Sequence, residues 1–170
     1  MIYKKNNENI RFKLFYILDI GSDYDRRIPL ALDYLQFLGT NDISPAKKSQ
    51  DFYRLGCELN IKCASDRVEL TLDGLASEFS ASVELFENIL VNCIPDEDAL
   101  LEFKAIKLKE RADLKLNRQA ILFRGMLNYA KYGPLSSFSN VLSDQEIDSV
   151  TAQELVDILH NLMTYKHRIL

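Results

Sequence analysis

Very few side chains of this 170-residue chain have the types and spacing that catalysis or metal binding requires. Its two histidines, His160 and His167, both lie near the C-terminus, so neither a serine–histidine–aspartate triad nor a three-histidine zinc site can be assembled. The three cysteines, Cys57, Cys63 and Cys93, form no Cys-x-x-Cys pair, which argues against a zinc ribbon, and we expect them to be free thiols. We therefore assign no catalytic residue, no metal ligand and no cofactor to this chain.

Glycine placement and charge argue against further classes of function. The six glycines stand singly, so neither a dinucleotide-binding pattern nor a phosphate-binding P-loop occurs. The 21 basic and 25 acidic residues give a net charge of −4, without the basic excess of a nucleic-acid-binding protein. No stretch approaches the roughly 18 uncharged apolar residues of a transmembrane helix. We expect neither nucleic acid nor membrane as a partner, and the cellular compartment stays open.

One segment nevertheless has an informative order of residues. Leu30, Asp33 and Tyr34 stand on a helical stretch that follows a strand, and the run Phe37–Thr40 (Phe-Leu-Gly-Thr) comes soon afterwards. This order resembles the insulinase/pitrilysin family of zinc metallopeptidases, whose catalytic domains carry the motif HxxEH on their first helix, followed by Phe-Leu-Gly-Thr. Aligning on that run places the family's first histidine on Leu30, its glutamate on Asp33 and its second histidine on Tyr34.

The resemblance implies that this domain has lost its zinc site. Leucine offers no donor atom, a tyrosine phenol with a pKa of about 10 keeps its proton at neutral pH, and Asp33 cannot hold zinc alone. The family's third ligand, a glutamate well downstream of the second histidine, falls near Glu110. Glu110 is either the remnant of that ligand or an ordinary surface glutamate beside Lys109 and Arg111.

Further short runs extend the resemblance along essentially the whole chain. Residues 73–75, 111–115 and 129–133 look like those of the zinc-free half of long bacterial members. Family peptidases consist of two halves that close around a chamber, and usually only one half carries zinc. The resemblance therefore implies a non-catalytic domain, the first of the zinc-free half. Such a domain forms the chamber wall and holds a peptide or small protein opposite the catalytic half, which lies in the same or a partner chain.

Two other interpretations stay open beside this one. The chain is alternatively a scaffold or assembly subunit, as some members of the same superfamily have become, and would then bind no peptide. A peptidase activity of the fragment itself would need a metal site that the sequence does not contain. In the first interpretation, zinc and endopeptidase activity belong to the catalytic half of the parent.

The elements that must position these residues follow from the spacing of apolar side chains. Residues 12–20 are apolar at nearly every position, which predicts a central strand covered on both faces. Alternating apolar residues predict an antiparallel hairpin of residues 58–64 and 67–73. Apolar residues at helical spacing predict helices over 28–38, 45–55, 79–93, 101–116 and 119–131, and from 151 onward.

Three details of these helices can be tested directly against a structure. We expect Leu30 and Leu38 in the core. On the 101–116 helix we expect one stripe that includes Leu101, Leu108 and Leu116 to face it. Capping boxes are expected at two helix starts, and they pair Ser143 with Glu146 and Thr151 with Glu154.

The composition, 47% hydrophobic and 27% charged, is that of a folded, soluble domain. No repeat or linker interrupts it, so we expect residues 1–170 to form one α+β unit: an antiparallel-rich mixed sheet with helices packed on it, of the insulinase or LuxS metallopeptidase type. Residues 167–170 begin a strand that ends with the chain. We therefore expect a domain truncated at its C-terminus, a fragment of a larger multidomain peptidase.

Overall fold

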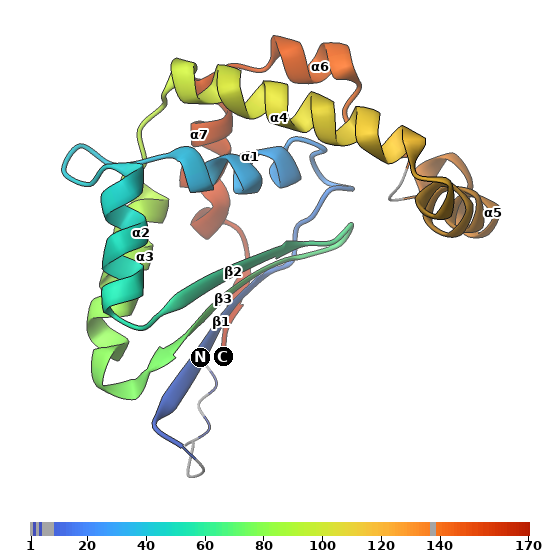
Figure 1. Cartoon of the computed structure of the whole chain (residues 1–170). Helices are drawn as coiled ribbons and strands as arrows, with labels where there is room; N and C mark the ends of the chain where they lie inside the picture. The colour runs from blue at the N-terminus through green and yellow to red at the C-terminus, as the bar shows by residue number, and fades with distance from the viewer. Residues whose placement is uncertain (1, 3, 5–8, 137–138) are drawn as a thin grey trace.

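The computed structural model describes residues 2, 4, 9–136 and 139–170, which form a four-stranded sheet with helices stacked on it (Figure 1). The strands are β1 (Arg11–Leu18), β2 (Glu58–Cys63), β3 (Val68–Leu75) and β4 (His167–Ile169). The α-helices are α1 (Ile28–Tyr34), α2 (Pro45–Arg54), α3 (Phe79–Asn92), α4 (Glu97–Leu116), α5 (Leu127–Tyr132), α6 (Asp144–Ser149) and α7 (Ala152–Asn161). Shorter helical turns are η1 (Leu35–Phe37), η2 (Ala76–Glu78), η4 (Gly133–Leu135) and η5 (Leu162–Thr164), and η3 (Ala120–Met126) is π-helical.

The sheet has the strand order β2-β3-β1-β4, and each of its pairings is antiparallel. The predicted hairpin is confirmed as β2 and β3, and β1 is central, with Tyr16 opposite Leu70 on one side and Ile169 on the other. Helices and sheet make up an α+β fold, as expected from the sequence.

The prediction that the first strand is covered on both faces is wrong. Leu14, Tyr16 and Leu18 are buried, whereas Phe15 and Ile17, which alternate with them, are only partly buried. The helices lie on one face of the sheet (Figure 1). On the other face neighbouring side chains give partial cover, as where the Lys13 ammonium lies 5.6 Å from the centre of the Phe15 ring. An apolar run signals burial, but does not show whether a helix or a long side chain supplies it.

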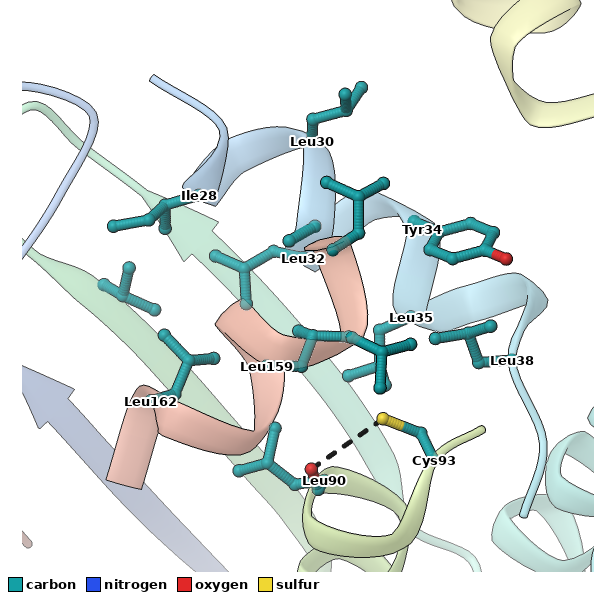
Figure 2. Close-up of a cluster of buried hydrophobic side chains, with 14 of the residues drawn as sticks. Ile28, Leu30, Leu32, Tyr34, Leu35, Leu38, Leu90, Cys93, Leu159 and Leu162 are labelled. Carbon is teal, nitrogen blue, oxygen red and sulfur yellow. Dashed lines mark hydrogen bonds between the residues drawn. The ribbon is translucent and has the colours of Figure 1, made fainter. Parts of the chain in front are cut away.

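The core lies between the sheet and the helices α1, α3 and α7. Figure 2 shows Leu32, Leu35 and Leu38 of the α1 region gathered beside Leu159 of α7 and Leu90 of α3. Leu38 is fully buried and Leu30 is 7% exposed, so both are buried as predicted.

Local side-chain chemistry fixes several helix starts. Ser143 caps α6 and Thr151 caps α7, and each forms the expected reciprocal capping box with the glutamate three residues later. Ser44 caps α2, with Pro45 at the first helical position. These caps supply acceptors to backbone N–H groups that have no partner inside their own helix.

The stripe predicted on the fourth helix is displaced. The residues that α4 buries are Leu100 and Phe103, near its start, whereas Leu101 is 72% and Leu116 is 81% exposed. The fully buried residues of α4 lie in its first two turns. Its middle contacts α1 and α6 through the ion pairs of Lys107 and Arg111, and its end runs on to α5 at the far end of the molecule (Figure 1). A helical repeat alone therefore identified neither the face nor the length that is buried.

Residues 116–132, here called the apolar segment, expose many large apolar side chains. Leu116, Ile121, Leu122, Phe123, Met126, Leu127, Tyr129 and Tyr132 are between 38% and 81% exposed. The predicted helix over 119–131 is confirmed as helical, but it consists of η3 followed by α5. Across the described part of the chain, no helix combines the length and apolarity that crossing a membrane requires.

Candidate functional site

Helix α1 carries the three positions that the resemblance assigns to the zinc motif. Leu30, Asp33 and Tyr34 are three and four residues apart, so they lie on neighbouring parts of one helix surface. Leu30 and Tyr34 are buried, and the side chain of Asp33 is 48% exposed. In Figure 2 the Leu30 side chain points to the side of α1 away from Leu159. The backbone thus presents these three positions together, but only Asp33 carries a group that binds cations.

Tyr34 acts as an anchor between α1 and the start of α4. Its hydroxyl donates to the Asp96 carbonyl at 2.5 Å and accepts from the Asp96 N–H at 3.3 Å. Its ring lies 5.5 Å from that of Phe103, which also packs against Phe37. Burial is the largest influence on the Tyr34 phenol and raises its pKa to about 12. A protonated phenol with both hydrogen-bonding functions in use is unsuited to bind zinc.

Asp33 and Glu110 both form ion pairs with one lysine, Lys107. The Lys107 ammonium lies 2.9 Å from a carboxylate oxygen of Asp33 and 2.9 Å from one of Glu110. It also lies 5.6 Å from the centre of the Phe103 ring, within the range of a cation–π contact. Burial opposes the charge of Lys107, but hydrogen bonds to the two carboxylates outweigh it and raise the pKa of the ammonium. Asp33, Lys107 and Glu110 are called the ion triad below.

A pocket of about 480 Å³ lies beside the ion triad. Its lining includes Leu30 and Asp33 of α1, Lys107 and Arg111 of α4, and Cys63 at the end of β2. The Arg111 guanidinium is paired with Asp144 at 3.0 Å. Burial raises the pKa of the Cys63 thiol to about 11, so the thiol is protonated at neutral pH and is not a ready nucleophile. The pocket contains charged groups and an apolar wall, but no activated catalytic group.

The Phe37–Thr40 run has a structural role that explains its pattern. A Cβ on Gly39 would lie 2.4 Å from the Ile43 carbonyl, so a larger residue does not fit without movement. Thr40 donates its backbone N–H to the same carbonyl at 2.8 Å, and its hydroxyl accepts from the Ile43 N–H at 3.1 Å. The run is therefore a tight turn between η1 and α2, which a domain needs whether or not it binds a metal.

Lys48 of α2 stabilises this turn through hydrogen bonds. Its side chain is buried, and its ammonium donates to the carbonyls of Leu35, Gln36 and Leu38 at 2.6, 3.0 and 2.7 Å. Burial lowers the pKa of Lys48 to about 8. The carbonyls that end a helix have no intrahelical donor, so this lysine supplies what a C-cap would otherwise provide.

The donor set at the motif positions does not fit zinc. A zinc site needs about four nitrogen, sulfur or oxygen ligands around one point, and here two carboxylates face an ammonium. No cluster of three or more histidine, cysteine, aspartate or glutamate side chains that could hold a metal ion occurs among the described residues.

Sequence reasoning found Asp33 and Glu110 but missed the residue that joins them. The spacing of Lys107 and Glu110 on a helix signals an i,i+3 ion pair, which is visible in the sequence. Contact with Asp33 depends on how α4 crosses α1, and no local pattern shows that crossing. The Lys107 side chain is only 25% exposed, so this charge is partly withdrawn from water.

Comparison with known proteins identifies the fold. No protein-family profile and no curated protein matches the chain. Among solved structures, the periplasmic protease PqqL from Escherichia coli matches with a TM-score of 0.73 and 12% identity, over 98% of this chain and 19% of that one. A protease from Helicobacter pylori matches with a TM-score of 0.67 and 16% identity, over 91% of this chain and 38% of that one. A peptidase M16 inactive domain from Pseudomonas fluorescens matches with a TM-score of 0.71 and 22% identity, over 90% of this chain and 38% of that one.

The three matches agree with one another and with the resemblance in the sequence. The chain spans about a fifth to two fifths of the lengths of these proteins. M16 is the insulinase/pitrilysin type of peptidase, and one match is described as its inactive domain. The chain thus has the fold of an M16 peptidase domain.

Proposed function

We propose that this chain is a non-catalytic domain of an insulinase/pitrilysin-type zinc metallopeptidase and belongs to that family. The observation that carries the proposal is the combination of this fold with a motif helix on which Leu30 and Tyr34 are buried and Asp33 is paired with Lys107. The supporting turn at Phe37–Thr40 is retained, while no imidazole stands at the motif positions. Loss of ligands with retention of the scaffold is what an inactive half of such an enzyme requires.

We propose that the domain forms part of a chamber wall and holds peptide along β2. Within the described residues β2 pairs only with β3, so its outer edge is available for strand addition. The pocket beside the ion triad adjoins the end of this strand at Cys63. An extended peptide added to β2 would gain backbone hydrogen bonds and could place a side chain in that pocket. These features support the binding of peptides without cleavage.

A larger assembly is supported by the apolar segment. Apolar patches that stay exposed on a folded domain are typical of surfaces that contact another protein. The proposed partner is the zinc-bearing catalytic half, in the same polypeptide or in a partner chain, and the parent is a zinc metalloendopeptidase. In that arrangement the chain is a fragment of a larger multidomain peptidase.

Peptide holding can be tested by NMR titration of the purified chain with a mixed-sequence decapeptide. We expect chemical-shift changes concentrated in Glu58–Cys63 and around the pocket, and no cleavage of the peptide in the presence of zinc. The control is the same peptide N-methylated at alternate residues, which removes backbone donors and should weaken binding by at least about tenfold. Equal binding of both peptides, or shifts confined to other surfaces, would contradict the role of the β2 edge.

The interpretation as an assembly subunit leads to a different expectation for peptide binding. The apolar segment suits a scaffold equally well, but a scaffold has no need of an open peptide-binding edge. A coding sequence for an HxxEH-bearing half, in the same gene or beside it, would favour the peptidase interpretation. If no such half is encoded nearby and the decapeptide does not bind, the assembly-subunit interpretation is favoured.

A further inference from the structure

The ion triad places a single positive charge between two carboxylates from different helices. Asp33 belongs to α1 and Glu110 to α4, and each has an oxygen 2.9 Å from the Lys107 nitrogen. Without a cation between them, two carboxylates this close would repel each other. In proteins, a divalent metal ion commonly binds between two such carboxylates, but here the ammonium of Lys107 lies between them.

The Lys107 ammonium is held by the geometry around it as well as by charge. The ammonium has three N–H donors, of which the two carboxylates engage two. The face of the Phe103 ring borders it at 5.6 Å, and the Phe103 side chain is itself fixed in the core, at 1% exposure. The Lys107 side chain is 25% exposed, so it is partly withdrawn from water. Three groups on two helices therefore define one position for a cation.

We infer that Lys107 is an internal substitute for a metal ion: its ammonium occupies the place between Asp33 and Glu110 that a divalent cation would need, and thereby excludes such cations. The choice of this place rests on the proposed function, because the family resemblance assigns Asp33 and Glu110 to the lost zinc site. The inference that Lys107 excludes divalent cations rests only on the contacts of the ion triad. A hard divalent cation favours carboxylate and water oxygens, so removing the ammonium leaves a weak two-carboxylate site for it.

The test compares Mn²⁺ binding by the wild-type chain and a Lys107→Met variant, followed as paramagnetic broadening of backbone amide signals. Methionine keeps an apolar stem of similar length but removes the charge. We expect Mn²⁺ to broaden the amides around Asp33 and Glu110 in the variant at concentrations at least about tenfold lower than in the wild type. Lys107→Gln also removes the ammonium charge and takes the place of the methionine variant if that variant does not fold.

Two controls make the outcome specific to the ion triad. Lys109→Met removes the same charge from an exposed position on the same helix, and should leave Mn²⁺ binding as in the wild type. Adding Asp33→Asn to Lys107→Met should abolish the gain. Broadening around Asp33 and Glu110 in the wild-type chain at the same concentrations, or a folded Lys107 variant that binds no tighter, would overturn the inference. Neither result depends on peptide binding, so this inference and the proposed function can fail separately.

Discussion

Replacing Tyr34 by phenylalanine tests whether this residue, which the resemblance aligns with the second histidine of the zinc motif, has a structural role. The change removes only the hydroxyl, and leaves a ring that can still pack on Phe103. The hydroxyl of this fully buried residue donates one hydrogen bond to the Asp96 carbonyl and accepts one from its N–H. We expect the substitution to lower the free energy of unfolding.

The size of this effect follows from the two hydrogen bonds. Each contributes a net of about 0.5 to 1.5 kcal/mol, and a buried group left without its partner adds to the loss. We therefore expect Tyr34→Phe to cost about 1 to 3 kcal/mol, measured by urea denaturation followed by circular dichroism. In a domain of this size, each kcal/mol corresponds to a fall in Tm of about 2 to 4 °C.

Tyr53→Phe is the matched control, because Tyr53 is 89% exposed and the same atom is removed. We expect that variant to stay within about 0.5 kcal/mol of the wild type. If Tyr34→Phe were as stable as Tyr53→Phe, the Tyr34 hydroxyl would not anchor α1 to α4. Our reading of position 34 as a structural residue would then be refuted.

Three further predictions follow from other parts of the same region. Leu38→Ala should cost about 2 to 5 kcal/mol, because Leu38 is fully buried, and an unchanged denaturant midpoint would contradict this. Burial lowers the pKa of Lys48 to about 8 from 10.5, so the unfolded chain binds more protons between these values, and the free energy of unfolding should rise with pH there. The free energy of unfolding of Lys48→Met, measured by urea denaturation at a series of pH values beside the wild type, should lack that rise. Parallel pH profiles of the two proteins would contradict the lowered pKa of Lys48. The purified chain should retain no stoichiometric zinc after dialysis; retained zinc that is lost on changing Asp33 or Glu110 to alanine would disprove the absence of a metal site.

Local patterns predicted much of the fold because local forces create those parts. The two capping boxes depend on residues three positions apart, and the β2–β3 hairpin depends on alternation around a short turn. The burial of Leu38 followed from helical spacing with its neighbours. Each of these features is decided within a few residues of the chain, so one sequence suffices to see it.

The features that sequence reasoning missed depend on contacts between distant segments. The displaced stripe on α4 arises because that helix buries its apolar side chains only near its start and meets α1 and α6 farther along through charged side chains. Cover of β1 on one face depends on where all the helices lie, which an apolar run does not specify. At the candidate site, the sequence indicated Asp33 and Glu110, but Lys107 becomes informative only when α1 and α4 are seen side by side. The missing information in each case was tertiary.

The apolar segment also affects how different parts of the domain open to solvent. Its helical backbone has little side-chain burial to oppose local unfolding, whereas β1 and α7 lie in or against the core. Amide hydrogens of β1 and α7 should therefore exchange with water only when the whole domain unfolds, and those of α5 should exchange far sooner through local opening. One chain thus has two exchange regimes. A partner that covered the apolar segment would slow the hydrogen exchange of the α5 amides and leave the exchange rate of the core amides unchanged.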